Sequence, residues 1–262
     1  MAPILGRYGP FFLYSYEIVV GLGLFAVYGL VSRQARQLSL ADWLDAGLAG
    51  LIGAIAGGRL LFVLVNWDYF QLHTTEIWQV WRGGLVYIGV LLGAMSALLI
   101  WRRRRQRSFL AYADLYAPAL ALLSAFGWLA CWLEGCAYGR EAAVHPLSAP
   151  LPDSFGVTLV RYQTQLLGLA ATVLIFLLIW RVRYRLYLGQ LFWLAMLLLS
   201  ATRVVSGLFR GDLGSSLDSY FSPLNSALVA DLTVMLVSCG ALILGHRRAL
   251  PNRRVQLRNI EK

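Results

Sequence analysis

Three arginines, Arg140, Arg203 and Arg210, are the residues of this 262-residue sequence whose type and spacing best suit chemistry. A guanidinium group is a planar fork of N–H donors that matches the oxygens of a phosphate. Arg203 and Arg210 are seven residues apart, which is about two turns along one face of a helix. All three lie near ends of apolar runs that should meet one side of a membrane. We expect them to hold a phospholipid headgroup and to stabilise negative charge on a departing phosphate.

The apolar runs must position these arginines, and their length indicates membrane helices. Apolar residues make up 59% of the chain and charged residues only 14%, and the mean hydropathy is +0.64. A membrane-spanning helix needs about 17–25 mostly apolar residues. We therefore predict an all-α integral membrane protein with about seven transmembrane helices, near residues 11–31, 43–66, 85–101, 110–133, 163–180, 188–206 and 224–244.

The positive charges predict the orientation of these helices. The formal net charge is +10, but the arginines form short clusters between apolar runs, which argues against nucleic-acid binding. Most of the Lys and Arg residues follow the first, third, fifth and seventh runs, and such clusters face the cytoplasm. The N-terminus is therefore expected outside and the C-terminus inside. We predict a membrane domain over residues 1–246 and a basic cytoplasmic tail over residues 247–262.

Cysteines and glycines suggest local structure. Cys131 and Cys136 lie close together in sequence, and Cys239 lies in a late apolar run. A zinc site needs about four paired ligands, so no metal or cofactor is expected. Whether Cys131 and Cys136 form a disulfide is left open by the sequence. The glycines of the second run, from Gly47 to Gly58, should let two helices approach closely.

Six segments spread over nearly the whole chain form a recognisable pattern. They are Tyr14–Tyr16, 53–60 (GAIAGGRL), 81–85 (WRGGL), 127–140 (GWLACWLEGCAYGR), 164–166 (TQL) and 203–212 (RVVSGLFRGD). In this order they resemble the prolipoprotein diacylglyceryl transferase family, and segment 127–140 is the most similar to the family signature. Members of that family move the diacylglyceryl group of phosphatidylglycerol onto a cysteine thiol of a lipoprotein precursor. The resemblance implies a multi-pass transferase of the bacterial cytoplasmic (inner) membrane that acts in lipoprotein biosynthesis.

The resemblance also assigns roles to individual residues. Phospholipid binding would fall to Gly139, Arg140, Arg203, Arg210 and Arg59. Tyr16, Glu134 and Arg203 would be catalytic, with Tyr16 and Glu134 orienting or activating the acceptor and Arg203 stabilising the leaving phosphate. Glu134 could act as the base where burial favours its protonated form.

Purely structural roles stay open for several of these residues. Glu17 and Arg59 could form an internal ion pair between helices, and Glu134 could bridge to Arg140. Arg140 and Arg210 could be interfacial arginines that extend to water.

Four residues of the family pattern are missing, and Glu134 stands where the family signature has an asparagine. The family histidine falls on Ile88, its first signature arginine on Trp128, and two carboxylates on Gly168 and Gly207. Attack by a thiol needs the thiolate, which a base or a positive field normally supplies. The departures therefore favour an alternative hypothesis, a non-catalytic phospholipid-binding membrane protein that kept the fold and lost the chemistry.

Overall fold

The computed structural model describes residues 4–8, 11–105, 108–153, 156–212 and 226–260. Arg107, the end of the expected tail and most of the polar stretch before the seventh apolar run lie outside the described residues. The long helices are α1 (Ser15–Gln37), α2 (Trp43–Val65), α4 (Tyr87–Arg105), α5 (Phe109–Glu134), α6 (Thr164–Val182), α7 (Gln190–Phe209) and α9 (Ser226–Ile260). Short helical turns lie between α2 and α4: α3 (Trp67–Phe70), η1 (Thr74–Glu76) and η2 (Val80–Arg82).

Six helices in the described part of the chain are long and apolar enough to cross a membrane. They correspond to the first, second, fourth, fifth, sixth and seventh predicted runs. The remaining predicted run is α4, whose last turn consists of four arginines, Arg102 to Arg105, and it does not count among the six. The structure confirms a helical multi-pass membrane protein, whereas the seventh span and the orientation stay predictions. The helix α9 continues through the expected tail as far as Ile260.

Two short antiparallel hairpins interrupt the all-α pattern. The strand β1 (Ile4–Tyr8) pairs with β2 (Phe11–Tyr14), and β3 (Ser148–Pro152) pairs with β4 (Thr158–Tyr162). Both hairpins lie outside the six candidate spans.

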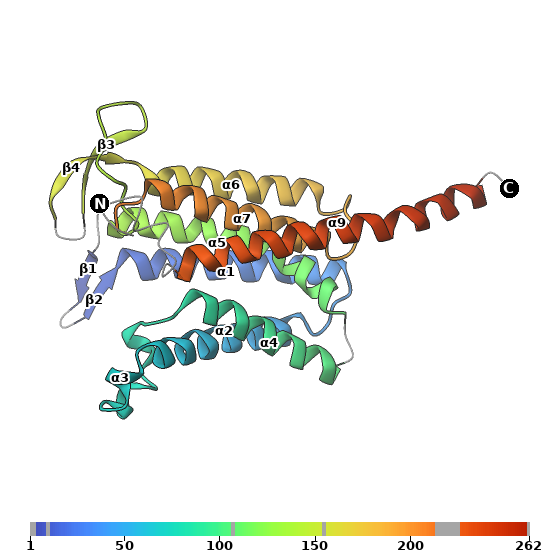
Figure 1. Ribbon diagram of the computed structural model, residues 1–262, viewed down its shortest axis with the longest axis horizontal. Helices are drawn as coiled ribbons and strands as arrows, with labels where there is room; N and C mark the ends of the chain where they lie inside the picture. The colour runs from blue at the N-terminus through green and yellow to red at the C-terminus, as the bar shows by residue number, and fades with distance from the viewer. Residues whose placement is uncertain (1–3, 9–10, 106–107, 154–155, 213–225, 261–262) are drawn as a thin grey trace. The chain divides into compact units, whose positions relative to one another are not determined.

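The chain forms two compact units, of which unit 1 comprises Met1–Arg33 and Ala113–Lys262. Its core packs small and branched side chains of α5, α6 and α7 together, among them Ala117, Ile179 and Ala195. Four leucines of α6 are exposed, Leu167, Leu174, Leu177 and Leu178, as is expected where lipid replaces water as the solvent. Helices α1 and α6 begin, and α5 and α7 end, at the end of unit 1 that carries the two hairpins (Figure 1). We call this the hairpin end.

The start of α7 is held by a carboxylate from another helix. Gly189 precedes α7 in a left-handed conformation and provides no capping side chain. Asp114 of α5 accepts hydrogen bonds from the backbone N–H groups of Gly189 and Phe192, the latter at 2.9 Å. A carboxylate suits the N-terminus of a helix because the first N–H groups there have no helical partner.

Unit 2 comprises Gln34–Tyr112 and is built on the packing of α2 against α4. A methyl group added at Gly57 would overlap the backbone of Gly89 and Gly93, and one added at Gly53 would overlap Gly93 and Ala97. The two helices therefore touch backbone to backbone. This confirms the close approach predicted from the glycines of the second run.

This packing predicts that Gly57→Ala destabilises the protein by about 1–3 kcal/mol, because the added methyl must push two backbones apart. Thermal unfolding of the purified protein in detergent measures the effect. Gly21→Ala is the matched control, since Gly21 is also helical and a methyl group there meets nothing within 4 Å. Equal melting temperatures for the two variants would contradict the account.

Candidate functional site

The segment Glu134–Arg140, which we call the signature loop, leaves the end of α5 in a tight turn. Gly135 and Ala137 both have positive φ angles, 92° and 53°. Such angles suit glycine but cost an alanine roughly 1–2 kcal/mol. Cys136 lies between these two residues and forms a disulfide with Cys131 in the last turns of α5. The bond that the sequence left open therefore ties the turn to its own helix.

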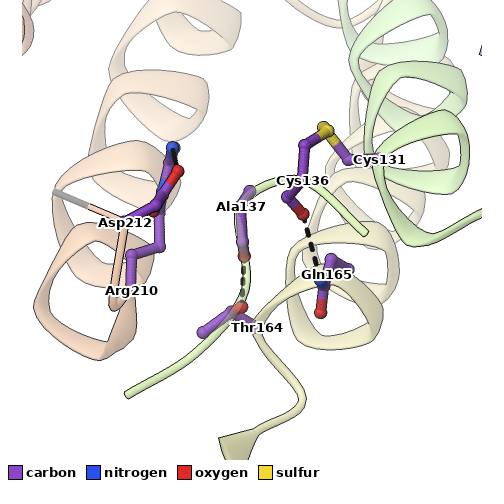
Figure 2. Close-up of a disulfide and its surroundings, with 7 residues drawn as sticks. All are labelled: Cys131, Cys136, Ala137, Thr164, Gln165, Arg210 and Asp212. Carbon is purple, nitrogen blue, oxygen red and sulfur yellow. Dashed lines mark hydrogen bonds and ion pairs between the residues drawn. A yellow bond between two sulfur atoms is a disulfide. The ribbon is translucent and has the colours of Figure 1, made fainter. Parts of the chain in front are cut away.

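Two buried side chains at the start of α6 hold the signature loop from the other side. The Thr164 hydroxyl donates to the Ala137 carbonyl at 2.6 Å, and the Gln165 amide donates to the Cys136 carbonyl at 3.0 Å. Figure 2 shows both contacts beside the disulfide. Thr164 and Gln165 are at most 1% exposed. The Thr-Gln pair, which sequence analysis noted only as a similarity, thus satisfies loop carbonyls that have no helical partner.

The far end of the signature loop pairs with the end of α7. Gly139 and Arg210 form an antiparallel bridge. The Arg140 N–H donates to the Phe209 carbonyl and the Gly211 N–H donates to the Tyr138 carbonyl, both at 2.8 Å. The Arg140 side chain adds a bond from Nε to the Arg210 carbonyl at 3.0 Å. Three predicted residues, Gly139, Arg140 and Arg210, therefore lie side by side.

Gly139 fits this place because it has no side chain. It is buried, and a Cβ atom there would overlap the Tyr162 carbonyl. The Tyr162 N–H in turn donates to the Arg140 carbonyl at 3.1 Å. The loop therefore runs between β4 on one side and the end of α7 on the other.

Arg161 of β4 supports the loop and was missed by the sequence analysis, which counted it only as a positive charge. Its side chain is buried, pairs with Asp153 at 3.2 Å and lies over the Tyr138 ring at 5.1 Å. One guanidinium nitrogen lies 3.5 Å from the Gly139 carbonyl. The only sequence signal was an arginine within a short stretch of β-forming residues.

Arg203 of α7 and Arg210, which follows α7, both face carboxylates. Arg210 makes two hydrogen bonds to Asp212, at 2.8 and 2.6 Å (Figure 2). The Arg203 Nε atom lies 3.0 Å from both carboxylate oxygens of Asp231 in α9. Sequence analysis did not single out Asp231. Among the described residues, no group of three or more His, Cys, Asp and Glu side chains is arranged to hold a metal ion.

Tyr16 and Glu134 are both exposed. Tyr16 lies in the first turn of α1 and Glu134 is the last residue of α5, so both belong to the hairpin end of unit 1 (Figure 1). The role of Glu134 as a base was expected to depend on burial, and the Glu134 side chain is not buried.

Arg59 belongs to unit 2, whereas the other predicted site residues belong to unit 1. Its Nε and both terminal nitrogens donate to the backbone carbonyls of Ile77, Gly83 and Glu76. The guanidinium also lies over the rings of Phe62 and Phe70, and it lines a cavity of about 380 Å³. These bonds fix the segment between α2 and α4.

Two of the four departures from the family pattern are in contact. Trp128 of α5 packs its indole ring on Gly168 of α6, where any Cβ atom would overlap the ring. A large apolar ring against bare backbone fills the space at which the resemblance implies an arginine and a carboxylate. With Trp128 in this position, a side chain at position 168 would have no room.

The close fit of Gly139 predicts that Gly139→Ala loosens the signature loop. The added methyl would displace Tyr162 and weaken the bonds between the loop and the end of α7. Hydrogen exchange followed by mass spectrometry should show faster exchange in peptides that contain the Arg140 and Gly211 amides. Gly240→Ala is the control, because a methyl group there meets nothing within 4 Å. Unchanged exchange in Gly139→Ala would refute the prediction.

Comparison with known proteins agrees with the resemblance. A sequence model of the family described as prolipoprotein diacylglyceryl transferase matches residues 3–244. A phosphatidylglycerol–prolipoprotein diacylglyceryl transferase of Clostridium tetani is 26% identical over 81% of this chain and 86% of its own length. Proteins of the same name are 31% identical in Bordetella parapertussis, over 68% of this chain and 70% of their own, and 29% identical in Vibrio vulnificus, over 81% and 75%. The chain belongs to the prolipoprotein diacylglyceryl transferase family.

Proposed function

We propose that the chain transfers the diacylglyceryl group of phosphatidylglycerol to the cysteine thiol of a lipoprotein precursor. The observation that carries the proposal is the pairing of Gly139 and Arg140 with Arg210, which brings two arginines of the family segments together at one end of the helices. Family membership supports the same activity. Phosphatidylglycerol and the precursor are the proposed partners, and the bacterial cytoplasmic membrane is the proposed location.

The proposed reaction is a substitution at carbon. The thiolate sulfur bonds to the carbon of the diacylglyceryl group that carries the phosphate, and the bond from that carbon to the phosphate oxygen breaks. Its electron pair stays on the oxygen, so the products are a thioether and glycerol phosphate. The proton of the thiol passes to a base or to water, and neither an oxidant nor a reductant is needed.

Arg140, Arg203 and Arg210 hold the phosphate in this proposal, with Gly139 allowing the backbone to approach it. A guanidinium group has five N–H donors, and Asp212 uses only two of those on Arg210. Charge that grows on the leaving phosphate is stabilised by these fixed cations. Tyr16 and Glu134 orient or activate the acceptor from the same end of unit 1. Phospholipid binding by Arg59 stays a prediction, and its guanidinium donates to carbonyls of the segment between α2 and α4.

The positive-inside rule supports an orientation that suits this reaction. With α4 as the seventh span, the N-terminus lies outside and residues 1–246 form the membrane domain. The basic residues 247–262 then lie on the cytoplasmic side. The hairpin end of unit 1 faces outward, where the cysteine of a secreted precursor would emerge.

The alternative is a phospholipid-binding protein without catalysis, and the residue at position 88 favours it. Ile88 cannot accept a proton from a thiol. Glu134, which stands where the family has an asparagine, is exposed. The residues at positions 128 and 168 argue less strongly, because Trp128 packs on Gly168 and keeps α5 in contact with α6.

The proposal predicts that the purified protein forms a thioether-linked product from phosphatidylglycerol and a lipobox peptide. Mass spectrometry of the peptide detects the added diacylglyceryl group. Arg210→Ala should slow the reaction by about 10²- to 10³-fold, the cost of removing a donor to developing negative charge. Arg183→Ala is the control, since Arg183 follows the other end of α6 and donates to the Trp180 carbonyl.

Absence of product over a range of acceptor peptides would reject the transferase function. Glu134→Gln separates the alternatives further. Loss of transfer with retained lipid binding supports the acceptor role of Glu134. The non-catalytic alternative predicts that Arg203→Ala weakens lipid binding while Glu134→Gln changes nothing.

A further inference from the structure

Asp231 is the only charged residue in the apolar helix segment Ala227–Gly245. It is 4% exposed. Asp231 lies about one turn after the start of this segment. Charged residues within membrane helices are rare and usually have a partner and a function. Neither the family segments quoted above nor the predicted site includes this carboxylate.

Its partner is Arg203 of α7. The Nε atom of Arg203 lies 3.0 Å from both Asp231 oxygens. The two side chains differ in exposure, because 42% of the arginine but only 5% of the aspartate is exposed. The carboxylate is thus enclosed between α7 and α9, whereas the guanidinium is anchored at one edge and accessible elsewhere.

Helix α7 does not itself provide a carboxylate for Arg203. The residue one turn later, where the family pattern has an acidic residue, is the buried Gly207. Ser206, which lies nearby, bonds the Arg203 carbonyl and not its side chain. A negative charge for Arg203 therefore comes from α9.

We propose that Asp231 is a positioning residue that replaces the carboxylate missing at position 207 and orients the Arg203 guanidinium toward the phosphate of the lipid. The inference rests on the proposed function, and it adds the residue on which one phosphate-binding arginine depends. The ion pair restricts the orientation of the guanidinium, so the group is positioned before the lipid arrives. Preorganisation of this kind is what makes a cation effective in the transition state.

The test is a double-mutant cycle in the thioether assay. Asp231→Asn keeps the shape of the side chain and removes its charge, and it should lower kcat by roughly 10- to 100-fold, the cost of a misplaced catalytic group. Because Asp231 acts through Arg203, the double variant Arg203→Ala with Asp231→Asn should be no slower than Arg203→Ala alone. Thr233→Ala is the control on the same helix, since that exposed hydroxyl bonds its own helix at Val229.

A relocated carboxylate provides the rescue. Asp231→Asn combined with Gly207→Glu places the acid four residues after Arg203, within reach on the same helix face. This variant should recover transfer to within about tenfold of the wild-type protein. It is also the variant to assay if Asp231→Asn does not accumulate in membranes. Absence of transfer in the folded Asp231→Asn, Gly207→Glu variant would overturn the proposal. So would a wild-type kcat in Asp231→Asn, or a kcat for Arg203→Ala with Asp231→Asn below that of Arg203→Ala alone.

Lipid binding distinguishes failure of this inference from failure of the proposed function. If the wild-type protein transfers nothing, the function fails, and retention of phosphatidylglycerol in phosphatidylcholine nanodiscs then tests the pair. Asp231→Asn and Arg203→Ala should weaken retention equally, and the double variant no further. Unchanged retention in Asp231→Asn would refute the positioning role by itself.

Discussion

Backbone carbonyls and N–H groups of the signature loop must find hydrogen-bond partners at the end of a helix bundle, where the regular ladder stops. An unpaired buried backbone group costs about 1–3 kcal/mol, so the loop can exist only where other elements supply partners. Thr164 and Gln165 supply them from α6, while Phe209 and Tyr162 supply them from α7 and β4. The disulfide closes the turn on the α5 side.

This constraint explains why the arginines gather. The loop cannot pair with α7 unless Gly139 lies against Tyr162, and that register sets Arg140 beside Arg210. Positive charge then accumulates at the hairpin end of unit 1, and Asp153, Asp212 and Asp231 pair with the arginines there. Each pair limits the directions a guanidinium can take. The resulting cluster is ordered before any lipid binds, which suits recognition of a phosphate.

Local patterns were enough to predict the helices, but not the contacts between distant residues. Apolar run length located the long helices, and the glycines of the second run indicated the contact of α2 with α4, because both depend on neighbours in sequence. Asp231 and Arg161 escaped notice because their partners, Arg203 and Asp153, can be identified only once the chain is folded. The role of Thr164 was hidden for the same reason. Arg59 was assigned to phospholipid binding because it lies in a segment that resembles the family, and the carbonyls that its side chain contacts could be identified only in the folded chain.

The central claim is that the arginines beside the signature loop bind the phosphate of the lipid. An electron cryomicroscopy map of the protein in nanodiscs containing phosphatidylglycerol tests it most directly. The account predicts headgroup density within hydrogen-bond distance of the side chains of Arg140, Arg203 and Arg210, at the hairpin end of unit 1. Headgroup density bound only elsewhere, with these three arginines making no contact to it, would contradict the account.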